Sequence, residues 1–173
     1  HKIIYELADC QSTNTNYTFA LEVIRKYSPD EIDDYWRWKI ILLKARLHMQ
    51  QEDFGTAYDV NDEAYALTSK INDNRLNMQM RAETHKQRGL IHYYDNDYMK
   101  AQSMFEDALK LYRSANDITG MSAANNNLGV LAMTQGNWKE TERLYLESLT
   151  LDEQRFNLNG ISYVYNNLGY LFD

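Results

Sequence analysis

The sequence of 173 residues has the length of one domain and carries 25 Asp and Glu against 18 Lys and Arg, a net charge of −7. An acidic chain is a poor non-specific nucleic-acid binder, because affinity for duplexes comes largely from neutralising phosphates. One cysteine excludes an internal disulfide, and no apolar run approaches the roughly 20 residues of a membrane helix, so we expect a cytoplasmic protein that binds neither nucleic acid nor membrane.

Helices are expected along the whole chain. It has one proline, Pro29, and seven glycines, and no Asn-Gly or Asp-Gly hairpin lies between alternating segments. The expected first helices of successive helix pairs cover residues 1–13, 35–50, 79–94, 119–134 and 160–173. Short polar turns are expected within the pairs at 14–16, 51–53, 95–97 and 135–137. The connections 116–120 and 157–160 join neighbouring pairs, each with a glycine available for a left-handed helix cap.

A repeat with a period of about 40 residues underlies this pattern. Gly89, Gly129 and Gly169 recur at one constant interval, and the first two are followed nine residues later by Tyr98 and Trp138. The same spacing then brings a small residue, an aromatic one and another small one. These residues are Ala101, Phe105 and Ala108 in one unit and Thr141, Tyr145 and Ser148 in the next.

Earlier units follow the same pattern with an alanine in the place of the glycine, at Ala8 and Ala45. Repeats are therefore predicted to begin near residues 1, 38, 82 and 122, with a partial repeat from 162, in one array over 1–173. Small residues let two helices approach closely, and each pair buries only part of its apolar surface. Neighbouring pairs must therefore stack to complete a core.

The order Gly89, Tyr98, Ala101, Phe105 and Ala108 resembles the signature of the tetratricopeptide repeat. The period of about 40 residues, in place of about 34, is similar to a longer subtype. That subtype occurs in bacterial peptide-sensing regulators of the Rap type, in large bacterial transcription activators and in animal cell-polarity adaptors. The resemblance implies a right-handed superhelical solenoid of antiparallel helix hairpins, without a cofactor, whose concave groove is lined by the first helix of each pair. Its partner would be a protein or peptide.

Three basic residues fall on the expected concave wall: Lys39, Arg46 and Lys86. A basic strip in an otherwise acidic protein suits a carboxylate, such as an acidic peptide or a chain terminus. The alternative is that these are ordinary solvated side chains, partly paired with Glu83 or Glu52.

Amide side chains fall on the same wall: Gln87, Asn126, Asn127, Asn166 and Asn167. Asparagine is a mediocre helix former, yet a pair of them recurs in the same register of two successive repeats. The resemblance implies that the second asparagine of each pair grips the backbone of a bound peptide. The alternative is that the amides bond between adjacent helices and fix the stacking.

Two tyrosines of the last predicted helix, Tyr163 and Tyr170, complete the expected binding surface. Tyrosine is favoured at interfaces, whereas the alternative for each ring is packing between repeats.

No catalytic constellation is evident, and we expect neither enzyme activity nor a metal site. His85 and His92 are seven residues apart, on a face expected to pack between helices. Metal sites more often pair histidines four residues apart or add close cysteines and carboxylates. Cys10 has no histidine nearby, and no glycine-rich phosphate loop occurs.

We therefore expect a fragment of a larger bacterial regulator, serving as its sensor or interaction region and holding an extended peptide or partner helix in the groove. The alternative is a passive scaffold that bridges two proteins without switching. The sequence stops before a second helix of the last repeat. Apolar residues are then expected to lack cover and to promote self-association: Val164, Leu168, Leu171 and Phe172.

Overall fold

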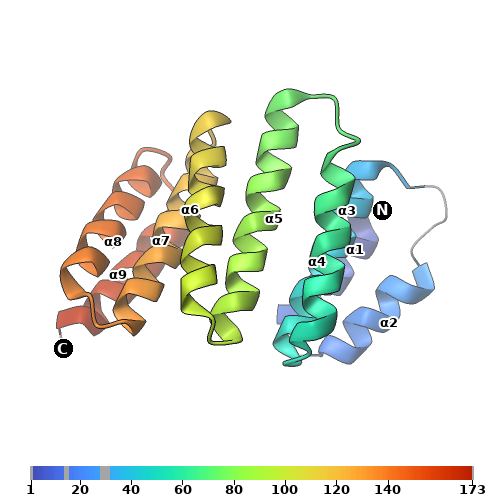
Figure 1. Ribbon diagram of the computed structural model, residues 1–173, viewed down its shortest axis with the longest axis horizontal. Helices are drawn as coiled ribbons and strands as arrows, with labels where there is room; N and C mark the ends of the chain where they lie inside the picture. Colours follow the sequence, from blue (N-terminus) through green and yellow to red (C-terminus); the bar gives the residue numbers. More distant parts are fainter. Residues whose placement is uncertain (1, 14–15, 28–31, 173) are drawn as a thin grey trace.

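The computed structural model describes residues 2–13, 16–27 and 32–172, apart from the side chains of residues 3, 4, 10–13, 27 and 170–172. Over these ranges the chain is helical and contains no strand, which confirms the all-α prediction (Figure 1). The helices are α1 (Lys2–Thr13), α2 (Tyr17–Tyr27), α3 (Asp34–Gln50), α4 (Phe54–Thr68), α5 (Asn74–Tyr94), α6 (Tyr98–Ser114), α7 (Ile118–Thr134), α8 (Trp138–Glu153) and α9 (Leu158–Phe172). No helix in the described part of the chain is long and apolar enough to cross a membrane.

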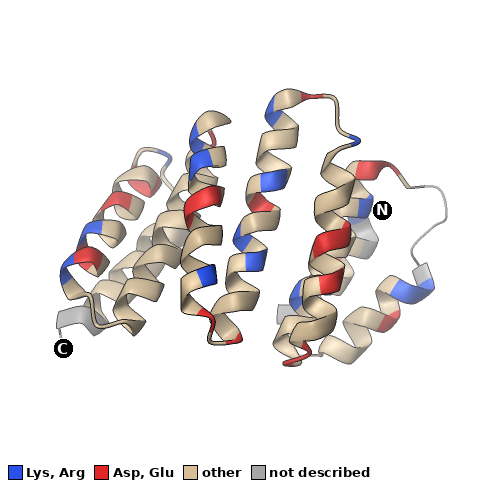
Figure 2. Cartoon of the chain, in the orientation of Figure 1, with Lys and Arg blue, Asp and Glu red and all other residues tan. Residues whose placement is uncertain are grey.

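Successive helices form antiparallel pairs that stack side by side into a solenoid. In Figure 1, α4, α6 and α8 lie toward the viewer, and α1, α3, α7 and α9 lie behind them. We call the side of α2, α4, α6 and α8 the outer face, and the side of α1, α3, α5, α7 and α9 the inner face. Acidic and basic residues are interspersed on the outer helices rather than segregated by sign (Figure 2).

Aspartates begin most of these helices. In each case the carboxylate accepts a hydrogen bond from the backbone N–H three residues later, which satisfies a donor that the first turn leaves free. The aspartates are Asp33, Asp53, Asp73, Asp97 and Asp117. Because Asp73 caps α5, that helix begins at Asn74, five residues before the expected start at residue 79.

Five of the described helices are followed by a residue in the left-handed backbone conformation, but the two glycines expected to cap helices are not among these residues. Positive φ angles occur at Glu52, Asn96, Asn116, Gly136 and Phe156. Each is followed by a residue whose N–H bonds to a carbonyl five residues earlier, as from Asp53 to His48 at 3.0 Å.

Gly120 and Gly160 instead lie in the first turns of α7 and α9. A Cβ at Gly120 would lie 2.0 Å from the ring of Tyr112, and one at Gly160 would lie 2.3 Å from the carboxylate of Asp152. These glycines are therefore required by close packing and not by backbone conformation.

The core confirms the spacing of small and aromatic residues. A Cβ at Gly89 would come within 2.5 Å of the ring of Phe105, and one at Gly129 within 2.5 Å of Tyr145. Side chains larger than glycine are thus excluded at both contacts unless the ring moves. The small residues at the matching positions of the second helices are fully buried: Ala101, Ala108, Thr141 and Ser148.

The last helix is covered differently from the expectation. Val164 is 1% exposed and Leu168 9%, because both pack with Tyr145 and Leu149 of α8. These two residues do not lack cover, which corrects the sequence-based expectation. The side chains of Leu171 and Phe172 lie outside the described residues, and self-association through this end stays a prediction.

Candidate functional site

The inner face is hollowed between α1, α3 and α5 into a cavity of about 350 Å³. Tyr5 of α1 and Tyr112 of α6 contribute to its walls. The apolar part of the lining consists of Trp38, Leu42, Leu43, Leu76 and Met80, and the polar part includes Lys39, Arg46, Gln79, Glu83 and Gln87. Apolar walls with a few placed polar groups are typical of ligand sites.

Lys39 reaches the cavity from α3 among three aromatic rings. Its Nζ lies 5.4 Å from the ring centre of Tyr5, 5.2 Å from that of Tyr35 and 5.4 Å from that of Trp36. An ammonium within about 6 Å of a ring centre is attracted by the negative face of the ring. The rings come from two helices, α1 and α3, and surround the ammonium group. They therefore hold Lys39 Nζ at the cavity.

The other two basic residues have acidic partners. Arg46 forms an ion pair with Asp9 of α1, and Lys86 Nζ lies 2.7 Å from Glu83 Oε2. Arg46 Nε is buried without a hydrogen-bond partner among the described residues. Lys86 does not line the cavity and adjoins it only through Glu83. The expected basic strip is thus partly neutralised by the chain itself.

Glu83 and Tyr112 form a second polar anchor of the cavity. The hydroxyl of Tyr112 donates to Glu83 Oε2 at 2.6 Å. Burial favours the neutral acid, but Lys86 and the hydroxyl of Tyr112 outweigh it and lower the pKa of Glu83. Burial and the neighbouring charge of Glu83 raise the pKa of Tyr112. The carboxylate and the neutral phenol are therefore the stable forms near neutral pH.

The amide residues separate into two groups. Gln87 lines the cavity, although it is only 6% exposed and its Nε2 lies 3.9 Å from the sulfur of Met49. The asparagines lie on α7 and α9, away from the cavity lining. Asn167 Nδ2 donates to Asn126 Oδ1 at 3.2 Å, so these two amides bond between neighbouring helices. That contact matches the stacking alternative for this pair, and it joins residues from different positions of the repeat.

Asn127 is half-buried and Asn166 is exposed, with no hydrogen bond between them in the described structure. Tyr163 is 54% exposed on α9. The side chain of Tyr170 lies outside the described residues. Asn127, Asn166 and Tyr163 stay candidate contacts for a ligand, because none of the hydrogen bonds among the described residues occupies their side chains.

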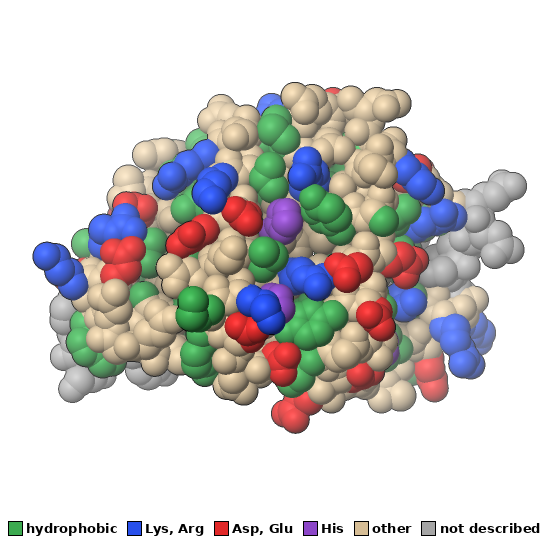
Figure 3. Space-filling model, in the orientation of Figure 1, with side chains coloured by type: hydrophobic (Ala, Val, Ile, Leu, Met, Phe, Trp, Pro, Cys, Tyr) green, Lys and Arg blue, Asp and Glu red, His purple; other side chains and the backbone are tan. Residues whose placement is uncertain are grey.

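Both histidines singled out in the sequence pack between helices, as predicted. His92 Nδ1 lies 2.8 Å from the hydroxyl of Tyr58, and the ring of His85 lies 5.3 Å from that of Tyr65. Parts of histidine side chains reach the surface near the middle of the outer face, next to Lys and Arg side chains (Figure 3). In the part of the chain that the structure describes, no three His, Cys, Asp or Glu side chains are grouped as a metal ion would require.

The sequence reasoning missed the aromatic rings around Lys39 and the pairing of Glu83 with Tyr112. The cluster Tyr35, Trp36 and Trp38 at the start of α3 is a visible signal for the rings. By contrast, Tyr5 and Tyr112 come from helices far away in the sequence. Their contribution depends on how the pairs stack, which a single sequence does not reveal.

Comparison with known proteins supports the fold. No protein-family model and no curated protein matches the sequence. A signal-transduction ATPase with a tetratricopeptide repeat sensor, from Pyrococcus horikoshii, superposes with a TM-score of 0.78 at 17% identity over 98% of this chain. The structure of BtubC from P. vanneervenii superposes with a TM-score of 0.72 at 17% identity, over 98% of this chain and 70% of that one.

The chain spans 26% of the length of the ATPase. At this low identity the likeness concerns the fold: the chain is a tetratricopeptide-like helical repeat, an all-α solenoid.

Proposed function

We propose that the chain binds a peptide segment of a protein partner along its inner face, as the interaction or sensor region of a larger regulatory protein. The cavity between α1, α3 and α5 carries the proposal, because it combines an aromatic-held cation at Lys39, a carboxylate at Glu83 and apolar walls. The long repeat period adds support, since it resembles that of peptide-sensing regulators.

Peptide capture would use the two parts of the inner face differently. A side chain of the peptide would enter the cavity, where Lys39 and Arg46 favour an acidic group and the leucines accept apolar atoms. The peptide backbone would continue toward α7 and α9, where Asn127 and Asn166 offer amide donors and acceptors.

Selection from a random peptide display library tests this proposal, followed by titration calorimetry on the selected peptides. We expect Lys39→Gln to weaken binding about tenfold, as for loss of a charge-assisted hydrogen bond. Lys139→Gln, on the exposed side of α8, is the matched control and should bind normally. Peptides that bind both variants as well as the parent chain would place binding elsewhere and refute the proposal.

A sensor and a passive scaffold differ in their response to the peptide. Because each unit contacts only its neighbours, a ligand that spans several units can change the curvature of the array. Small-angle scattering would show a change in the radius of gyration on binding for a sensor, and none for a scaffold.

A further inference from the structure

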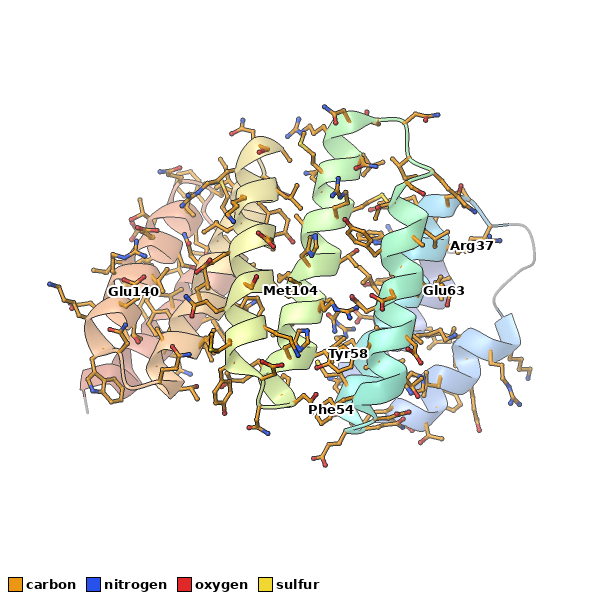
Figure 4. The ribbon with its side chains drawn as sticks, viewed as in Figure 1. Arg37, Phe54, Tyr58, Glu63, Met104 and Glu140 are labelled. Carbon is orange, nitrogen blue, oxygen red and sulfur yellow. The ribbon has the colours of Figure 1, made fainter. Side chains whose placement is uncertain are left out.

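A second cavity lies on the outer face, between α6 and α8, with α7 beneath it. Its volume is about 430 Å³. The apolar walls come from Leu109, Leu128, Leu131 and Leu144, whereas the charged groups lie nearer the surface on α6 and α8. Glu140, one of these polar residues, lies along α8 on the outer face (Figure 4).

Asn125 of α7 lines this cavity with a buried amide side chain. The residue is 2% exposed, and its Oδ1 receives no hydrogen bond from any described residue. Most buried side-chain oxygens are hydrogen-bonded, because a buried polar atom without a partner is destabilising. A ligand with an N–H donor that reaches this amide would supply the missing partner.

The charges at the cavity favour a cation. Glu106, Glu140 and Glu147 line it, against Arg113 and Arg143. Arg143 binds both Glu140, with Nε 2.8 Å from Oε2, and Glu147. Glu106 accepts only from the neutral amide of Gln102, at 2.9 Å, and forms no ion pair within the described residues. One carboxylate thus lies at the cavity without a cationic partner.

In the preceding repeat, the position that matches Glu106 is already paired with an arginine of the chain itself. The repeat aligns α5 with α7 when Gly89 is matched with Gly129. It aligns α4 with α6 when Ala57 is matched with Ala101. By this correspondence Glu106 takes the place of Asp62, and Leu128 the place of Arg88.

In that preceding repeat, Arg88 forms an ion pair with Asp62. Its guanidinium lies 5.3 Å from the ring centre of Tyr58, which is placed between α4 and α5 (Figure 4). Between α6 and α7 the carboxylate of Glu106 is kept, and no arginine of the described residues forms an ion pair with it. The earlier repeat therefore shows which group this position accepts.

We propose that the outer cavity between α6 and α8 receives an arginine side chain of a protein partner. The guanidinium donates to Asn125 Oδ1 and to the carboxylate of Glu106, since its several N–H groups can serve both acceptors. The leucine walls cover its methylene groups. This surface is separate from the inner face, so both can be occupied together.

Titration of the ¹⁵N-labelled chain with N-acetyl-L-arginine amide, followed by ¹H–¹⁵N NMR, tests the assignment. We expect saturable shifts at the Asn125 side-chain amide and at the backbone of 125–132, with a dissociation constant of roughly millimolar for so small a ligand. Glu106→Gln should weaken binding about threefold to fivefold, the size that a partly exposed ion pair supports. Glu142→Gln, exposed on α8 and outside the cavity, should leave it unchanged.

Two further measurements test whether the cavity prefers a positively charged ligand. Arg113→Gln should tighten binding of the arginine amide, because it removes a like charge from the lining. N-acetyl-L-citrulline amide, which has the same shape without the charge, should bind about threefold to fivefold more weakly.

Asn125→Leu removes the acceptor and should abolish the shifts in a chain whose circular dichroism is unchanged. If that variant does not fold, the Glu106 and Arg113 variants still decide the question. Shifts spread over the whole acidic surface, equal binding of citrulline, or preference for N-acetyl-L-glutamate amide would each overturn the proposal.

Discussion

The two halves of the inner face share their packing and differ in the side chains that they present. Gly89 meets Phe105 in one half as Gly129 meets Tyr145 in the other, with each virtual Cβ 2.5 Å from the ring. The first half also contains the cavity with charged residues between α1, α3 and α5, whereas the second half offers amides on α7 and α9. The repeated positions therefore determine the fold, whereas the positions between them vary and give each half a different set of exposed and cavity-lining side chains.

The largest expected effect tests the shared packing. Phe105 is 1% exposed in the core of α5 and α6, so Phe105→Ala should destabilise the array by about 3–5 kcal/mol through lost burial and a residual cavity. Urea denaturation followed by circular dichroism measures the loss. A cost below about 1 kcal/mol would show that the contact with Gly89 does not hold the pair together.

The three glycines at matching positions give a more selective test. Gly89→Ala and Gly129→Ala should each destabilise by about 1–3 kcal/mol, because a buried ring must move. At Gly169 a Cβ would meet nothing within 4 Å, so Gly169→Ala is the matched control. It should be neutral or stabilise the helix by up to about 1 kcal/mol. Equal losses at all three positions would contradict the packing described for α9.

The asparagines test the difference between the halves. Asn167→Ala removes the bond to Asn126 and should cost about 0.5–1.5 kcal/mol, as for a partly buried neutral hydrogen bond. Asn166→Ala should cost nothing or stabilise slightly, since Asn166 is exposed and alanine is the better helix former. Thermal unfolding of the two variants distinguishes these outcomes. A larger loss of stability for Asn166→Ala than for Asn167→Ala would show that Asn167 does not make the stacking contact.

The smallest expected effect is the pH dependence of folding stability that arises from His85, at the interface of α4 and α5. Burial chiefly lowers the pKa of His85 below 6.5; Arg81 and Arg88 lower it further, and Asp107 opposes them. The unfolded chain therefore binds a proton more readily, and stability falls as the pH drops below about 6.5.

His85→Asn introduces the residue found at the matching position, Asn125, and should make this fall shallower. Urea midpoints measured between about pH 7 and pH 5 test this expectation. His92 keeps part of the slope in both chains, because burial lowers its pKa as well. An unchanged slope would mean that protonation of His85 is not linked to folding.

The sequence was sufficient to predict contacts within a helix pair but not all contacts between pairs. The spacing from Gly89 to Phe105 reports which residues meet in one hairpin, because two helices and a short turn fix the geometry. By contrast, Asn126 pairs with Asn167 rather than with its own counterpart in the next repeat. Arg46, in contrast, pairs with its own counterpart in the preceding repeat, Asp9, and neither pairing is visible in the spacing of the repeat. Such contacts depend on the angle and shift between stacked pairs, which side-chain packing sets across the whole array.

The left-handed turns that end the helices also determine where this molecule can bend. Each turn joins its two helices within a few residues and is held by backbone hydrogen bonds, such as that from Asp97 N to His92 O at 2.8 Å. Turns of this kind also join neighbouring pairs, at Asn116 and Phe156, so we expect any bending where the outer helices of successive pairs slide on each other. Arg88 and Tyr58 already brace the contact between α4 and α5. An arginine held between α6 and α8 would link two such outer helices and oppose this sliding.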